Sequence, residues 1–243
     1  MLTKSFTFKR VYLWELPVRI FHWTTVFTTI TLIITGFIIA NPPAINSNLE
    51  ASSSYWFGYV RMIHFIAAMI LVANVFFRIY WSFVGNKFAH WRNFIPLSKK
   101  SWKNIWYVLK VDIFLMKDKE HKLSNISIGH NYLAAFSYFI MTLLFIFQVM
   151  TGFALLSETS SWWLPKSFGW VLNMCGGDIF TRYLHHFSTW MFMAFIAFHV
   201  YLVMYHDYLE ARGETSAMIS GYKFVRSERI AKENEDFNPD TKA

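Results

Sequence analysis

Four long apolar stretches constrain the fold of this chain more than any other feature. They lie near residues 22–40, 57–84, 131–156 and 183–206. A helix needs about 20 mostly apolar residues to cross a bilayer, and each stretch is about that length or longer. Hydrophobic residues make up 55% of the 243-residue chain and charged residues only 16%, a balance unlike that of soluble domains. The sequence predicts an all-α membrane protein with a four-helix bundle.

Lys and Arg are distributed very unevenly between the segments that flank these stretches. Residues 1–21 hold four, 85–129 hold nine and 207–243 hold six, whereas 41–56 hold none and 157–182 hold two. Because cytoplasmic loops carry the excess of Lys and Arg, both termini and the central loop are predicted to be cytoplasmic. The net charge of +8 follows from this bias and suits contact with anionic lipid, so nucleic-acid binding is not expected.

The chain is predicted to form one membrane domain, residues 1–223, with a cytoplasmic connector at 85–130 and a polar tail at 224–243. No Gly/Ser-rich or Pro-rich linker separates two cores. In the connector, apolar residues recur at steps of three and four, as in an amphipathic helix: Trp102, Ile105, Trp106, Leu109, Ile113 and Met116. This helix either lies on the inner membrane face or packs on the bundle.

Among the histidines of the apolar stretches, four lie at related depths: His22, His64, His185 and His199. Ionisable residues are rare inside membranes and usually mark a working site, although any single one can simply hydrogen-bond to a neighbouring helix. His185 and His199 share one helix face about 21 Å apart along the axis. Helix depth places His64 and His185 near the outer surface (the outer pair) and His22 and His199 near the cytoplasm (the inner pair).

Two pairs of histidines on facing helices suggest two haem sites. Bundles hold haem iron with axial histidines, and two of them leave no open position for substrate. Zinc is the weaker alternative, because it needs more ligands together or a bound water. Cys175 is the only cysteine and is expected to be an ordinary loop residue. Without a Cys-x-x-Cys-His motif, any haem would be held without thioether bonds.

Three arginines are candidates to neutralise haem propionates. Arg19 and Arg61 each precede a histidine by three residues, so they lie on nearly the same helix face as that histidine. Arg78 follows His64 by fourteen residues, at the depth of the inner pair. The alternative is that all three reach from helix ends to the lipid headgroups.

Three further polar residues lie near the cytoplasmic ends of the stretches. His206 is seven residues beyond His199 on the same face, so it competes with His199 as inner ligand or contacts a quinone. His130 and Asn131 open the third stretch, where they either cap the helix or bond to a quinone carbonyl.

The tripeptide Thr-Gly-Phe occurs in both the first and the third stretch, as Thr35-Gly-Phe37 and Thr151-Gly-Phe153. Glycine at these positions would let a planar cofactor approach the backbone, and close packing of small residues between helices explains it equally well.

Over nearly its whole length, the chain resembles the b-type cytochrome subunit of membrane-bound nickel-iron hydrogenases, because several short motifs occur in the same order. The matching stretches are PVRIFHW (17–23), GYVRMIHF (58–65), RIYWSFVGN (78–86), GHN (129–131), TGFALLSE (151–158) and HVY (199–201). The resemblance implies haem ligation by His22, His64, His185 and His199, and it favours His185 over His186. Many similar chains carry a glutamine soon after GHN, where this one has Ala134 and Ala135, so that quinone contact does not transfer.

The resemblance also implies a role in a complex of the bacterial inner membrane. The chain would anchor a periplasmic hydrogenase of small (iron-sulfur) and large (nickel-iron) subunits and relay electrons through two b haems to menaquinone or ubiquinone. Chemistry at hydrogen would belong to the partners, because one cysteine cannot ligate such centres. The alternatives are a cytochrome b subunit of a formate-dehydrogenase-type or other periplasmic oxidoreductase, and a haem-free membrane anchor or transporter.

Overall fold

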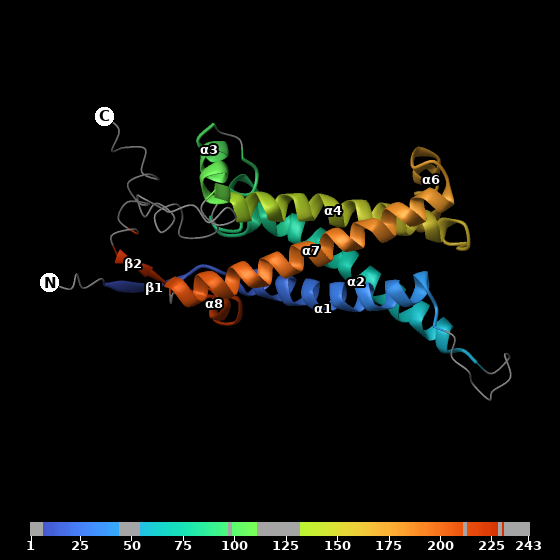
Figure 1. Ribbon diagram of the computed structural model, residues 1–243, viewed down its shortest axis with the longest axis horizontal. Coiled ribbons are helices and arrows are strands. Elements are labelled where there is room, and N and C mark those ends of the chain that lie inside the picture. The colour runs from blue at the N-terminus through green and yellow to red at the C-terminus, as the bar shows by residue number, and fades with distance from the viewer. Residues whose placement is uncertain are drawn as a thin grey trace. The chain divides into compact units, whose positions relative to one another are not determined.

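The predicted four-span, all-α architecture is confirmed by the computed structural model, which describes residues 7–43, 54–96, 99–110, 132–210, 213–227 and 230. The four long helices are α1 (Leu16–Ala40), α2 (Trp56–Val84), α4 (Tyr132–Ser157) and α7 (Asp178–Glu210) (Figure 1). Each is long and apolar enough to cross a membrane. Helix α1 begins at Leu16 and not near residue 22, because Pro17 fits the first helical turn.

The apolar and polar side chains of these helices are arranged as in a membrane bundle. Large apolar side chains point outward, as with Phe27, Phe76 and Phe198, which are 66%, 69% and 64% exposed. Small polar side chains such as Thr35 and Thr151 are buried between helices. Lipid replaces water as the solvent of the apolar surface, while small residues allow helices to approach closely.

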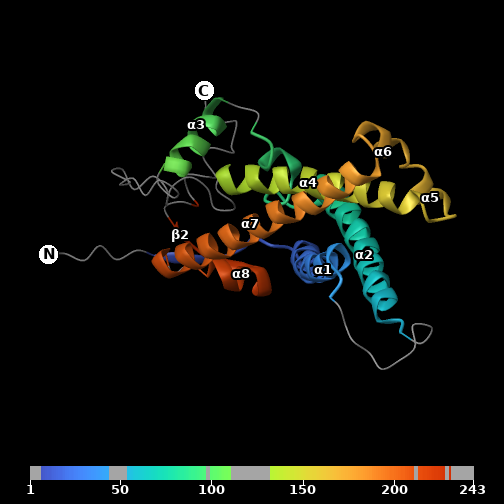
Figure 2. The same ribbon diagram turned by 45° about the vertical axis from the view of Figure 1, so that its right-hand side comes forward.

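The chain divides into two compact units, which are described separately. The first contains residues 20–80 and 141–199. It holds most of α1, α2 and α7, the later part of α4, and two short helices between α4 and α7: α5 (Trp163–Lys166) and α6 (Trp170–Met174) (Figure 2). All four histidines of the predicted pairs belong to this unit.

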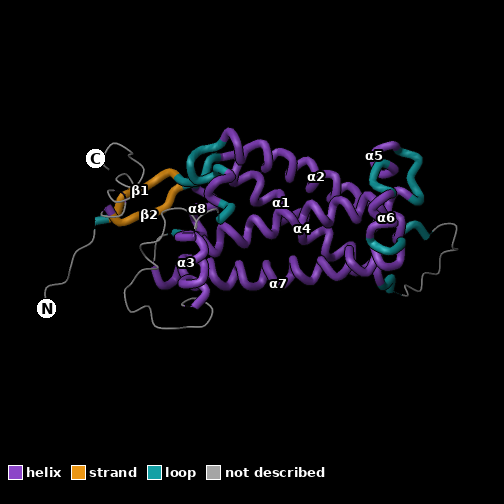
Figure 3. Tube along the Cα trace, turned by 90° about the horizontal axis from the view of Figure 1, so that it is seen from above, coloured by secondary structure: helices purple, strands orange, loops and turns teal. Residues whose placement is uncertain are grey.

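The second unit contains residues 1–19, 81–140 and 200–243. Its two strands, β1 (Phe8–Tyr12) and β2 (Tyr222–Arg226), form an antiparallel sheet in which Phe8 pairs with Arg226 and Tyr12 with Tyr222 (Figure 3). The N-terminal and C-terminal segments are therefore neighbours. No strand was predicted from the sequence. Strand β2 also crosses the predicted boundary between the membrane domain, residues 1–223, and the polar tail, residues 224–243.

A small buried cluster supports this sheet. Its buried members are Leu13, Trp14, Val18, Ala89, Ala217 and Val225. Ala217 belongs to α8 (Glu214–Ser220), the short helix before β2. The segment before α1 is also joined to the end of α2, because the Glu15 carboxylate accepts hydrogen bonds from the Trp81 indole and the Asn86 backbone N–H, both at 3.0 Å.

The predicted connector helix is present as α3 (Lys99–Val108), after the short 3-10 helix η2 (Trp91–Asn93). Ile105 and Val108 are buried, whereas Trp102 and Trp106 are more than half exposed. The helix thus packs on its own unit through Ile105 and Val108, and the partly exposed Trp102 ring lies edge-on to Phe136 of α4 with ring centroids 5.4 Å apart. The end of the predicted apolar face, Ile113 and Met116, lies outside the described residues.

Candidate functional site

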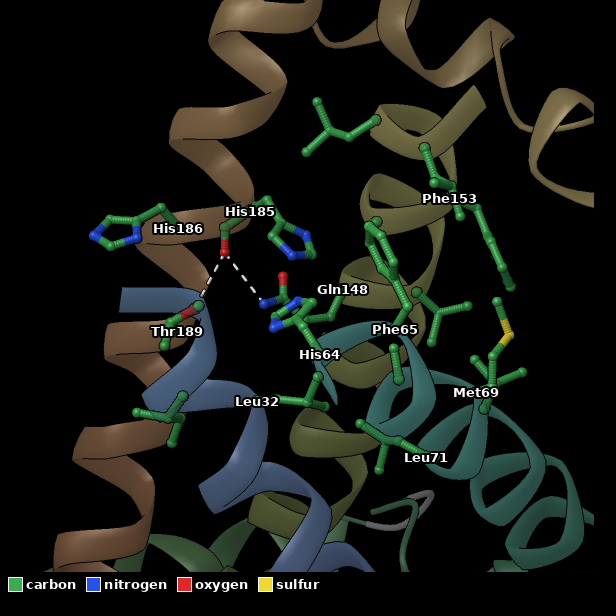
Figure 4. Close-up of a pocket in the computed structure, with 18 of the residues that line it drawn as sticks. Leu32, His64, Phe65, Met69, Leu71, Gln148, Phe153, His185, His186 and Thr189 are labelled. Carbon is green, nitrogen blue, oxygen red and sulfur yellow. Dashed lines mark hydrogen bonds between the residues drawn. The ribbon is translucent and has the colours of Figure 1, made fainter. Parts of the chain in front are cut away.

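The outer pair faces a cavity of about 320 Å³ lined by residues of α1, α2, α4 and α7. Figure 4 shows the rings of His64 and His185 turned into the same space, with Gln148 beside them. Small-molecule and cofactor sites commonly have volumes of about 300 to 1,000 Å³ and mostly apolar walls. The cavity therefore brings together the two histidines predicted near the outer surface, and it has the size and lining of a cofactor site.

Each histidine of the outer pair contacts a threonine on a neighbouring helix. Thr35 Oγ1 of α1 lies 2.8 Å from His64 Nδ1 of α2. In the same way, Thr151 Oγ1 of α4 lies 2.8 Å from His185 Nδ1 of α7. Both threonines are buried, at 7% and 0% exposure. These are the threonines of the repeated Thr-Gly-Phe tripeptide. The contact of their hydroxyl groups with histidine was not predicted from the sequence.

The glycines of the two Thr-Gly-Phe tripeptides make room for the same two histidines. A Cβ added at Gly36 would lie 3.6 Å from His64 Cε1, and one added at Gly152 would lie 3.3 Å from His185 Cε1. The second distance is tighter than normal packing, so a side chain there would press on the imidazole. The structure thus gives a direct reason for the glycines: each leaves space for a histidine ring of the next helix.

The backbone of His185 is held as well. Gln148 Nε2 donates a hydrogen bond to the His185 carbonyl at 3.2 Å, and Thr189 Oγ1 donates to the same oxygen at 3.4 Å (Figure 4). Ser188, which is 3% exposed, donates its hydroxyl hydrogen to Gln148 Oε1 or to the His185 carbonyl. Gln148 and Thr151 are one turn apart on α4, so one face of this helix fixes both the backbone and the ring of His185.

Two arginines line the cavity. Arg61, a predicted propionate partner, is one of them, and Arg182 of α7 is the other. Arg182 also lies 3.7 Å from the Asp178 carboxylate, in an exposed ion pair. Arg182 is one of the two basic residues of the segment 157–182, and its position three residues before His185 repeats the spacing of Arg61 and His64.

The inner pair is also brought together. The ring centroids of His22 and His199 are 6.5 Å apart, with 55° between the ring planes. Two imidazoles that ligate one ion from opposite sides through metal–nitrogen bonds of ~2 Å have centroids about 6 Å apart. In addition, His22 Nδ1 is buried and, within the described part of the chain, has no hydrogen-bond partner. An orphaned imidazole nitrogen of this kind fits a histidine that holds a ligand.

Asn74 connects α2 to the turn that carries His22. This buried amide donates to the Phe21 carbonyl at 3.1 Å and to Thr25 Oγ1 at 2.8 Å. Phe77 packs edge-on against Phe21, with ring centroids 4.7 Å apart. Arg78 follows Phe77 directly on α2, in the turn that packs beside the turn of His22.

The remaining predicted residues belong to the second unit or lie outside the described residues, apart from Cys175. Arg19 belongs to the second unit, where its guanidinium donates to the Ile219 carbonyl. His206 belongs to that unit too, with its ring against Tyr205. His130 and Asn131 lie outside the described residues. Cys175 is the C-cap of α6 and half-buried, a loop position as expected.

The donor set fits haem better than a bare metal ion. Across the described ranges, no three His, Cys, Asp or Glu side chains come close enough to hold an ion together. Two histidines at each site, with a cavity and arginines beside the outer one, are instead what a bis-histidine haem requires. The residues present therefore fit haem at both sites.

Comparison with known proteins identifies the family of the chain. Residues 13–221 match the family model of prokaryotic cytochrome b561. A probable Ni/Fe-hydrogenase B-type cytochrome subunit of Rhizobium leguminosarum is 34% identical over 238 residues, 96% of this chain and 94% of that protein. Its counterparts in Escherichia coli and Cupriavidus necator are 34% and 33% identical, over 90% and 88% of this chain and 93% and 87% of theirs. The chain belongs to the prokaryotic cytochrome b561 family, among the Ni/Fe-hydrogenase B-type cytochrome subunits.

Proposed function

We propose that this subunit relays electrons from a periplasmic iron-sulfur subunit through two bis-histidine b haems to quinone. His64 and His185 would ligate the outer haem, and His22 and His199 the inner one. The observation that carries the proposal is the convergence of both pairs, each with one histidine from α7. Along that helix the two sites are about 21 Å apart, enough to carry charge across most of the membrane.

The chain's own residues would determine how each site behaves. When bound, haem b supplies one-electron transfer. Two histidines at each iron close its coordination, so neither site would bind substrate at the metal. Arg61 and Arg182 would neutralise propionates at the outer site, and Arg78 would do so at the inner one, because a charge in an apolar bundle needs a partner.

Partners would supply the remaining chemistry. With one cysteine, this chain cannot ligate an iron-sulfur cluster, so those ligands would come from the hydrogenase small subunit and the nickel-iron centre from the large one. The excess of Lys and Arg supports cytoplasmic termini in a bacterial inner membrane, with the outer site toward the periplasm. Menaquinone or ubiquinone would then be reduced near the cytoplasmic face, where His130, Asn131 and His206 are the candidate contacts.

Haem stoichiometry in the purified complex tests the proposal. Reduced-minus-oxidised spectra should give two b haems per cytochrome chain. His64→Leu or His185→Leu should remove the outer haem and block quinone reduction, while hydrogen oxidation with an artificial acceptor continues. His186→Leu is the matched control and should keep both haems.

The inner ligand needs its own comparison. His199→Leu should leave one haem, whereas His206→Leu should keep two. The opposite result would move the inner ligand to His206. Absence of any b-type signal would instead favour the haem-free anchor, and co-purification with an oxidoreductase other than a hydrogenase would favour the second alternative.

A further inference from the structure

The hydroxyl hydrogens of Thr35 and Thr151 are directed to carbonyls of their own helices. Thr35 Oγ1 donates to the Thr31 carbonyl at 2.7 Å, and Thr151 Oγ1 donates to the Phe147 carbonyl at 2.9 Å. A hydroxyl has one hydrogen to donate but two lone pairs that accept. In the 2.8 Å contacts with His64 and His185, the hydroxyl oxygen is therefore the acceptor and the imidazole Nδ1–H is the donor.

This direction fixes the tautomer of both rings. A neutral imidazole carries one hydrogen, so a hydrogen on Nδ1 leaves the lone pair on Nε2. Nε2 is then the atom available to a metal, and the hydrogen bond also limits rotation of the ring. Partners of this kind orient metal-binding histidines and raise their basicity.

We propose that Thr35 and Thr151 are positioning residues that hold His64 and His185 in the Nε2-ligating tautomer and tune the electron donation of these rings to the outer haem. The inference rests on the proposed function and extends it to residues that do not touch iron. A hydroxyl is a weaker acceptor than the carboxylate that often fills this place, but its own donation to a carbonyl polarises it and strengthens its acceptance.

Two other buried threonines of the same unit bond to backbone carbonyls close to them in the chain. Thr28, as buried as Thr35, donates to the carbonyls of Thr24 and Thr25 on its own helix. Thr181, fully buried, donates to the Gly177 carbonyl at 2.7 Å. His22 of the inner pair also differs, because its Nδ1 has no hydrogen-bond partner within the described part of the chain. The threonine contact with His64 and His185 is thus not a feature of buried threonine in general.

Isosteric variants in the purified complex provide the test. Replacement by Val removes the hydroxyl acceptor and keeps the side-chain shape, in Thr35→Val, Thr151→Val and the double variant. Replacement by Ser keeps the acceptor, in Thr35→Ser and Thr151→Ser. The matched control is Thr28→Val. Spectroelectrochemical titration would give the midpoint potential of each haem. Electron paramagnetic resonance of the ferric haems would report the orientation and donor strength of the axial rings.

Loss of the acceptor should withdraw electron density from Nε2 and so destabilise ferric iron. Each Val variant should therefore raise the midpoint potential of one haem and shift its resonance, with the larger change in the double variant. The Ser variants and Thr28→Val should match the wild type. The potential of the second haem should stay unchanged throughout.

Two results would overturn the inference. The first is that both Val variants retain wild-type potentials and resonances. The second is that the Ser variants lose the outer haem while the Val variants keep it at the wild-type potential, which would assign the threonines a packing role through their methyl groups. Failure of the proposed function is separate, since it shows as a wild-type complex without two haems or a His185→Leu variant that retains both.

Discussion

Gly152 and Gly36 occupy corresponding places beside the outer histidines but leave different amounts of room. A Cβ would come within 3.3 Å of the His185 ring at Gly152 and within 3.6 Å of the His64 ring at Gly36. Gly152→Ala should therefore displace His185 and lower the outer haem content, whereas Gly36→Ala should be close to neutral. Haem-to-protein ratios after purification measure both. Equal losses in the two variants would mean that the glycines serve helix packing instead.

Replacement of Asn74 should lower the stability of the protein by an amount that its hydrogen bonds allow us to estimate. Its amide makes two hydrogen bonds to the turn of His22, and such bonds between membrane helices contribute about 0.6 kcal/mol each. Asn74→Leu should destabilise the protein by about 1 kcal/mol and reduce the inner haem preferentially, because His22 loses its support. Thermal unfolding and haem stoichiometry check this, with Thr28→Val as the control. Preferential loss of the outer haem would contradict it.

The histidines could be predicted from the sequence because an imidazole in an apolar stretch is conspicuous by itself. The threonine contacts could not, since a threonine in a helix normally bonds to its own backbone and the partner helix is unknown before folding. The repeated Thr-Gly-Phe did mark both places. Arg182 was missed for a related reason: the sequence places it at the edge of a loop, and only the extension of α7 to Asp178 makes it a cavity residue.

Among the elements, the paired strands β1 and β2 carry the clearest prediction. Val225 is 1% exposed in the buried cluster, whereas its neighbour Phe224 is 48% exposed on the opposite face. Val225→Asp would bury a carboxylate in an apolar cluster and should cost about 3 kcal/mol. Phe224→Asp should change stability by about 0.5 kcal/mol or less. Thermal unfolding and trypsin sensitivity in detergent compare the two, and similar behaviour would argue against this sheet.

The long helices were predictable and these strands were not, for opposite physical reasons. A membrane span must satisfy all its backbone hydrogen bonds internally, so about 20 apolar residues already determine a helix. Each strand has only five residues, includes Lys or Arg, and finds its partner more than 200 positions away in the chain. Such a pairing has no local signature and depends on where the four spans bring the two ends.

For the whole molecule, the pairing of β1 with β2 requires both ends of the chain to lie on one side of the membrane. The native Cys175 lies between α6 and α7, at the other end of α7 from Asp207. A membrane-impermeant maleimide should therefore label the native protein from the periplasm. A Cys175→Ser chain that carries Thr7→Cys should be labelled from the cytoplasm only. Labelling of both from the same side would exclude four spans.

Helix α7 contributes one histidine to each proposed site, and it is the last of the four spans to be synthesised. The ribosome releases α1, α2 and α4 while neither pair is complete, so no haem can be ligated by two histidines until the final span enters the bilayer. A chain that ends before Asp178 should accordingly insert but bind no haem. Loading of the two proposed sites would thus report that the last span has entered the bilayer, and a partner that docks only on the loaded form would reject chains that lack it.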